Sequence, residues 1–202
     1  MKNKAMEEMK PRVLARFGEA AGEKILARAE AELLELCRAH SGDPKPVKAH
    51  REGDIFPCIS LYRAMQAEGI QKEKALAFLD ESWSSRAKAG AEKNRKLLRL
   101  FGLYKLYPAM FRSVAKKQFG TAAGFEAKFY DTEKTRCKFD MTKCLFLDTC
   151  RDCGCPELKV CFCHTDDINN EGLHPRLRWN RTRYMGGGGD LCDFDIYVTE
   201  KK

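Results

Sequence analysis

The first 119 residues place apolar side chains at the spacing of an α-helix. Apolar positions recur at steps of three and four, which puts them on one face of each helix. Four segments share this pattern: residues 12–39, 55–65, 72–101 and 108–119. Gly18 and Gly22 are expected to divide the first, Gly69 to end the second and Gly90 to kink the third. These apolar stripes are interpreted as packing faces.

Residues 41–53 interrupt the helical pattern. The stretch holds Gly42, Pro44 and Pro46 among polar residues. Two prolines disfavour a continuous helix, because proline lacks the backbone N–H and restricts the residue before it. The sequence therefore predicts a loop here.

After Gly120 the period shortens to two residues, as in a β-strand. The segments with this alternation are residues 125–131, 135–141, 176–181 and 192–198. The first two are predicted to form a hairpin, and residues 142–152 a helix. The expected fold class is α+β, with N-terminal helices packed against a C-terminal antiparallel sheet of three to five strands. A helical region 1–119 and a sheet region 120–202 that carries the site are expected to form one compact domain.

Composition narrows the function classes. The 202 residues are 33% charged and 44% hydrophobic, which is typical of a soluble globular protein. No apolar run reaches membrane-spanning length, and the charged first nine residues are unlike a secretory signal. The net charge of +8 is interpreted as dispersed among acidic residues, without a nucleic-acid-binding motif. We therefore expect a cytoplasmic protein with a small-molecule partner, no nucleic acid and no membrane, and with homo-oligomerisation possible.

Eight of the ten cysteines follow residue 136. In a reducing compartment such a concentration favours metal binding or thiol chemistry over disulfides. The spacings of Cys150, Cys153, Cys155 and Cys161 allow zinc or an iron–sulfur cluster. Cys150 and Cys153 are equally compatible with neighbouring positions one helical turn apart.

The richest cluster of reactive groups begins at Cys163. Histidines at 164 and 174 and nearby arginines are groups that favour a thiolate. Asp166 and Asp167 follow Cys163 by three and four residues, so one of them can share its side of a turn and act as a general base or bind an amidinium. The alternatives are a buried inert thiol and a carboxylate that caps a helix or faces solvent. Alternation pairs Arg176 with Arg178 and Arg181 with Arg183, either as a carboxylate clamp or as a solvated strand face.

The order of these motifs resembles the L-2-amino-thiazoline-4-carboxylate hydrolase family. The resemblance covers roughly residues 121–198 and rests on the following groups of residues: Arg136-Cys137, Gly154-Cys155-Pro156-Glu157-Leu158, Phe162-Cys163 with Asp166, Leu173-His174-Pro175, Arg181-Thr182, and Gly189 with Cys192-Asp193-Phe194. The terminal strand is also distantly similar to the 4-vinyl reductase domain, a small-molecule-binding α+β fold.

The resemblance implies ring opening of a cyclic isothiourea to an N-carbamoyl amino acid without a cofactor. Cys163 is then nucleophile or water-positioning group, Asp166 base or amidinium partner, and Cys137 and Cys192 line the pocket or act as second thiols. Arg181 is the expected carboxylate anchor, with His174 and Asp193 as further substrate-binding residues. The alternative function is a non-enzymatic sensor that uses the same pocket for a small ligand or a metal.

Overall fold

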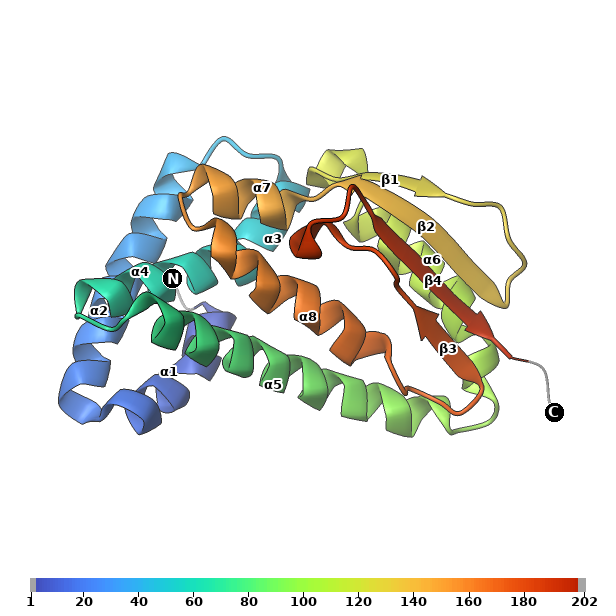
Figure 1. Cartoon of the computed structure of the whole chain (residues 1–202), viewed down its shortest axis with the longest axis horizontal. Coiled ribbons are helices and arrows are strands. Elements are labelled where there is room, and N and C mark those ends of the chain that lie inside the picture. The colour runs from blue at the N-terminus through green and yellow to red at the C-terminus, as the bar shows by residue number, and fades with distance from the viewer. Residues whose placement is uncertain (1–2, 200–202) are drawn as a thin grey trace. The chain divides into compact units, whose positions relative to one another are not determined.

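The computed structural model describes residues 3–199 (Figure 1). The chain forms two compact units: the residues up to Ser82 with Phe146–Cys161, and Trp83–Leu145 with the residues from Phe162 onwards. Each unit combines two separate parts of the chain, and the expected regions 1–119 and 120–202 stay a prediction.

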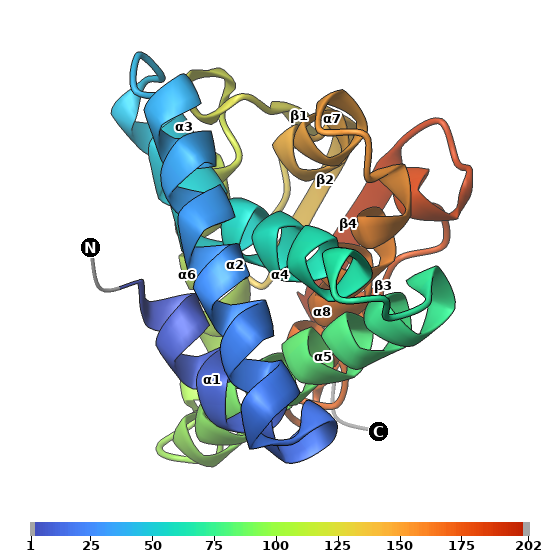
Figure 2. The ribbon, with the colours of Figure 1, turned by 90° about the vertical axis from the view of Figure 1, so that its left-hand side faces the viewer.

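The first unit is helical. Its main helices are α1 (Lys4–Phe17), α2 (Glu19–Ala39), α4 (Phe56–Ala67) and the first part of α5 (Lys72–Leu98). The predicted break falls at Gly18, whose φ of 79° is available to glycine at little cost. Figure 2 shows α1, α2 and α4 next to one another. Their apolar stripes meet in a core that includes Met9, Val13, Ile25 and Ile59, all fully buried.

The loop predicted for residues 41–53 is confirmed for residues 41–44 and wrong from Lys45 onwards. Helix α3 (Lys45–His50) begins there and continues through a π-helical stretch, Arg51–Ile55, into α4. Pro46 is tolerated because it lies in the first turn of α3, where backbone N–H groups have no partner within the helix. Buried Val47 and Ile55 give the segment its packing contacts.

The second unit contains an antiparallel sheet, as predicted. Strands β1 (Glu126–Phe129), β2 (Arg136–Lys143), β3 (Leu177–Asn180) and β4 (Cys192–Val198) are ordered β1-β2-β4-β3. Helix α6 (Tyr107–Gln118) lies along the sheet in Figure 1. Phe111 of α6 contacts the rings of Phe139 and Trp179 at centroid distances of 6.3 and 6.2 Å. The architecture is therefore α+β.

The helical segments between the strands complete the fold. Helix α7 (Leu145–Asp152) ends before Gly154, which has a φ of 69°, as the sequence indicates. Helix α8 (Lys159–Asn170) includes both the apolar run 160–163 and the acidic positions that follow. Among residues 3–199, none of the helices has the length and apolarity needed to cross a membrane.

Candidate active site

Helix α8 and the strand pair β3–β4 bring four of the candidate residues together in the second unit. Cys163 and Asp166 lie three positions apart on α8 and therefore share one side of it. Arg181 directly follows β3, and Cys192 begins β4. The periodicity of the sequence predicted the two strands. Cys163 and Asp166 share a face only because residues 159–170 form a helix.

Arg181 is the centre of this cluster. Its Nη1 donates to Asp166 Oδ2 at 3.0 Å, and its Nη2 donates to Asp167 Oδ2 at 2.5 Å and to the Cys163 carbonyl at 2.9 Å. Only 1% of its side chain is exposed. Its Cζ lies 4.7 Å from the ring centroid of Tyr184, as in a cation–π contact. Arg181 thus holds the carboxylates of α8 in place, and little of its surface remains for the substrate carboxylate it was expected to anchor.

Asp167 is a site residue that sequence reasoning placed only as an alternative to Asp166. One oxygen accepts from Arg181 and the other from the indole nitrogen of Trp179, at 2.8 Å. Trp179 lies on β3, so Asp167 links α8 to the sheet. Its spacing of four residues from Cys163, about one helical turn, places it on the side of α8 that carries Cys163, but nothing in the sequence indicated its partner on β3.

Asp166 has an unusual acidity. Burial and, to a smaller extent, the neighbouring Asp167 carboxylate raise the pKa of Asp166 to about 7, although the Arg181 guanidinium acts in the opposite direction. The Asp166 side chain is nevertheless 40% exposed, and contact with solvent acts against the rise in its pKa. A carboxyl group with a pKa near neutrality can both accept and return a proton.

Two consecutive backbone N–H groups face the thiols of the cluster. Met185 N donates to Cys192 Sγ at 3.3 Å, and the Gly186 N–H forms a hydrogen bond to the Cys163 sulfur. Met185 and Gly186 belong to a short 3-10 turn, Met185–Gly187, that precedes β4. Gly186 therefore marks a close approach of the backbone to Cys163.

Both thiols are protonated in the free protein at neutral pH. Burial raises the pKa of Cys163 to about 12, with smaller contributions from Asp166 and Cys192, while Arg181 and the Gly186 N–H lower it. Burial also raises the pKa of Cys192. Cys163 consequently needs a base, or a bound cation, to become a thiolate.

Cys137 and His174 lie away from this cluster. Cys137 pairs with Ile196 and Met141 with Cys192, so the two thiols share a face of the sheet but lie four positions apart along it, roughly 13 Å. Arg112 forms a hydrogen bond to Cys137 instead. His174 stacks on Tyr104 at a centroid distance of 4.0 Å. The alternation in residues 135–141 and 192–198 puts each cysteine on the inward-facing set of its strand, but only the strand register could show how far apart they lie.

Asp193 has a local structural contact. Its carboxylate accepts hydrogen bonds from the backbone N–H and hydroxyl of Thr182 and from the backbone N–H of Arg183. These bonds hold the pKa of Asp193 below its usual range, against the effect of burial. Asp193 thereby fixes the chain that follows Arg181, and substrate binding by this residue stays a prediction.

The cysteines proposed as metal ligands lie in the first unit. Cys58 forms a hydrogen bond with Cys161, and the guanidinium of Arg63 forms one to Cys155. Within residues 3–199, no group of three or more His, Cys, Asp or Glu side chains has the arrangement needed to hold a metal ion. All ten cysteines are thiols rather than disulfide partners. Binding of zinc or iron by these cysteines stays a prediction, and no cluster of ligands in the described residues supports it.

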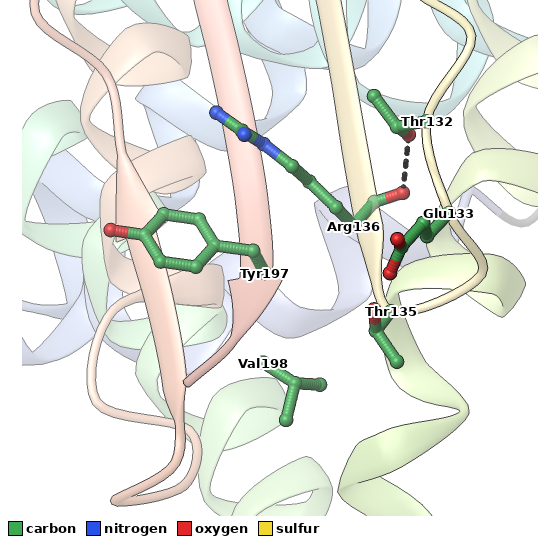
Figure 3. A pocket seen from close by; sticks show the side chains of 6 residues that line it. All are labelled: Thr132, Glu133, Thr135, Arg136, Tyr197 and Val198. Atoms are coloured by element: carbon green, nitrogen blue, oxygen red, sulfur yellow. Dashed lines mark hydrogen bonds between the residues drawn. The ribbon is translucent and has the colours of Figure 1, made fainter. Parts of the chain in front are cut away.

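A pocket of about 390 Å³ occurs elsewhere in the second unit (Figure 3). Its lining consists of residues from β2, β4 and the β1–β2 connection: Thr132, Glu133, Thr135, Arg136, Tyr197 and Val198. Arg136 is bound there to both oxygens of Asp195, at 2.9 and 2.6 Å. None of these lining residues carries a thiol or imidazole, so the pocket offers no nucleophile of the kind found beside Arg181.

The fold and this cluster define an α+β protein with a thiol–carboxylate site. The family model for L-2-amino-thiazoline-4-carboxylic acid hydrolase matches residues 48–196, about three quarters of the chain. The chain therefore belongs to the L-2-amino-thiazoline-4-carboxylic acid hydrolase family, and this membership supports a hydrolase function.

The remaining comparisons add no function. No curated protein matches the chain. The H-NOX domain of Shewanella oneidensis in its Fe(II)CO ligation state is 13% identical over 100% of both chains, with a TM-score of 0.37. The unliganded Fe(II) H-NOX protein from K. algicida is 11% identical over 100% of this chain and 98% of that chain, with a TM-score of 0.38. Similarity at this level supports no conclusion about activity or ligands.

Proposed function

We propose that the protein hydrolyses a small cyclic amidine that bears a carboxylate, of the L-2-amino-thiazoline-4-carboxylate type, to an N-carbamoyl amino acid. The observation that carries this proposal is the convergence of Cys163, Asp166, Arg181 and Cys192 in the second unit. Membership of the hydrolase family supports it. The proposed ring hydrolysis requires no cofactor.

The charge of the cluster suits an amidinium. Asp166 and Asp167 share one guanidinium, so the group carries one net negative charge when both carboxyl groups are ionised. A protonated amidine beside Asp166 would neutralise this charge and become more electrophilic at the ring carbon between nitrogen and sulfur. It would also favour the thiolate form of Cys163.

The proton balance then follows from the neighbouring groups. Cys163 gives its proton to the Asp166 carboxylate as its sulfur bonds to the ring carbon. The bond between that carbon and the ring sulfur breaks, and the leaving sulfur takes the proton from Asp166. Water, with Asp166 again as base, attacks the same carbon, and the Cys163 sulfur leaves and takes the proton back from Asp166. As the N-carbamoyl carbonyl forms, the proton that the amidine carried is released to solvent. Hydrogen bonds from Gly186 and Met185 hold the two thiols in place through the cycle.

Ring hydrolysis by a Cys163→Ser variant tests the proposal. We expect turnover to fall by more than about a hundredfold, because a hydroxyl is a far weaker nucleophile at neutral pH. Cys37→Ser is the matched control, since Cys37 is half-buried on α2 in the other unit. Unchanged turnover in Cys163→Ser would remove Cys163 from the chemistry. Absence of ring opening by the unmodified protein would reject the proposed substrate class.

A further inference from the structure

The turn between α5 and α6 gathers most of the exposed large apolar side chains of the described chain. They comprise two groups, one on each side of the turn: Leu97, Leu100 and Phe101, and Leu106, Met110 and Val114. Each exposes 50% or more of its surface, and Phe101 exposes 99%. Outside this turn, Leu34 is the one further large hydrophobic residue in residues 3–199 with comparable exposure. We call these six residues the apolar tip.

The spacing of the apolar tip gives it a defined surface. Leu106, just before α6, and Met110 and Val114 recur at steps of four and form one stripe along this helix. Leu97 lies in the last turn of α5, and Leu100 and Phe101 lie in the turn that follows the end of α5 at Leu98. On α6 this stripe differs from the one that packs inside the unit, which includes buried Pro108 and Ala115. Helix α6 therefore has a second apolar stripe, whose side chains keep half or more of their surface exposed in the described part of the chain.

Phe101 adds an independent observation. It is the one non-glycine residue with positive φ in the described chain, at 47°. The left-handed region costs such a residue about 1–2 kcal/mol, and a ring that is 99% exposed gains no packing in return. A strained backbone that presents an aromatic side chain to solvent points to an external partner.

The stretch of chain that carries the apolar tip is basic, although Glu92 forms ion pairs with two of its basic residues, Arg95 and Lys96. Between Glu92 and Glu126 the chain contains no acidic residue and eight basic ones: Lys93, Arg95, Lys96, Arg99, Lys105, Arg112, Lys116 and Lys117. The expectation that positive residues are dispersed among acidic ones is therefore wrong for this stretch. Lys105, next to Leu106, and Arg99, next to Leu100, are both exposed.

We propose that the apolar tip docks the protein on the surface of an anionic lipid bilayer. Apolar side chains with a basic rim are the combination that binds the boundary between headgroups and acyl chains, and each Lys or Arg near an anionic surface strengthens attachment. Phe101 and the leucines enter the boundary, and Arg99 and Lys105 meet the lipid phosphates. This surface attachment needs no spanning helix, but it departs from the expectation of no membrane partner.

The same charges argue against other occupants. In a symmetric pair of chains the basic rims would face each other, and like charges repel. Nucleic acid would satisfy the basic groups and could stack one base on Phe101, but the other five side chains of the apolar tip are aliphatic and offer neither stacking surfaces nor hydrogen bonds to bases. Anionic lipid can bind both the apolar side chains of the tip and the basic residues beside them.

Co-sedimentation with vesicles tests the proposal. The full chain should partition onto vesicles of phosphatidylcholine mixed with phosphatidylglycerol, weakly onto phosphatidylcholine alone, and less onto the mixed vesicles at about 0.5 M salt. Phe101→Ser should lower the partition coefficient about tenfold, and Lys105→Glu about fivefold or more. Leu34→Ser and Lys24→Glu, two exposed positions on α2, are the matched controls and should leave partition unchanged.

Several outcomes would overturn it. These are no binding to mixed vesicles, equal binding to neutral ones, or equal losses in the control variants. A dimer in solution that Phe101→Ser dissociates would assign the tip to a second copy. Binding of duplex DNA that competes fully with vesicles and survives Phe101→Ser would assign the charge to nucleic acid. Thermal unfolding of each variant shows whether it is folded, and ring hydrolysis, measured separately, leaves this test independent of the proposed function.

Discussion

Gly186 lies so close to Cys163 that a single added methyl group would collide with the sulfur. A Cβ at this position would be 2.4 Å from Cys163 Sγ. We expect Gly186→Ala to lower the free energy of unfolding by about 1–3 kcal/mol, because the turn or Cys163 must shift, and to reduce ring hydrolysis. Gly42→Ala is the control, since a Cβ there meets nothing within 4 Å. Equal unfolding midpoints in urea for the two variants would contradict the close approach.

Arg181 is the residue whose loss leaves two carboxylates without their cation. Arg181→Gln should lower the free energy of unfolding by about 1–3 kcal/mol, because bonds to charged groups in a partly desolvated setting are lost. Arg178→Gln, an exposed neighbour on β3, is the matched control and should stay within about 0.5 kcal/mol of the unmodified protein. Urea titration measures both, and a stability of Arg181→Gln equal to that of the control would show that the pairing contributes nothing.

Asp166 makes stability depend on pH in a defined direction. Its folded-state pKa of about 7 lies above its ordinary value of 3.8, so the folded state binds the proton more tightly than the unfolded state. The stabilisation by this proton is complete below about pH 4 and is lost as pH rises through about 7. Asp166→Asn should therefore gain stability relative to the unmodified protein between pH 5 and 8, as followed by thermal unfolding. Parallel pH profiles for the two proteins would refute a raised pKa at this residue.

At the scale of elements, the connection from β3 to β4 depends on one carboxylate. Asp193 accepts three hydrogen bonds from Thr182 and Arg183, and these hold the chain on which Arg181 lies. Asp193→Ala should cost about 1–3 kcal/mol of stability, since three donors lose their acceptor, and should weaken ring hydrolysis. Asp190→Ala, at a carboxylate that is 74% exposed, is the control. Hydrogen exchange at the Thr182 and Arg183 amides gives a local readout, and unchanged protection in Asp193→Ala would exclude this anchoring role.

The elements also show where sequence reasoning succeeded and where it failed. Alternation in 135–141 and 192–198 correctly predicted two strands whose cysteines share a face, because one-sided burial imposes a period of two. The loop prediction for residues 41–53 was wrong from Lys45 onwards, because proline is disfavoured inside a helix but tolerated in its first turn, where Pro46 lies. The contact of Asp167 with Trp179 was also beyond reach, because tertiary packing, not periodicity, determines which side of α8 faces the sheet.

At the scale of the whole chain, the alkylation rates of the ten cysteines report how deeply each thiol is buried. Seven cysteines are buried, and Cys37, Cys144 and Cys153 are half-buried. Because burial raises the pKa of Cys163 to about 12, this thiol carries almost no thiolate at neutral pH. We therefore expect iodoacetamide at pH 7 to modify the three half-buried cysteines first, as located by peptide mass spectrometry, and Cys163 only slowly.

Alkylation in the presence of a substrate analogue tests whether a bound amidinium activates Cys163. A non-hydrolysable cyclic amidine beside Asp166 places a cation near the Cys163 sulfur, which lowers the pKa of this thiol and raises its reactivity wherever the analogue leaves the sulfur accessible. A small amidinium salt should thus accelerate alkylation of Cys163 but not of Cys37, which serves as the internal control in the other unit. Fast alkylation of Cys163 in the unliganded protein would show that the thiolate exists without substrate, and that its activation does not depend on an amidinium.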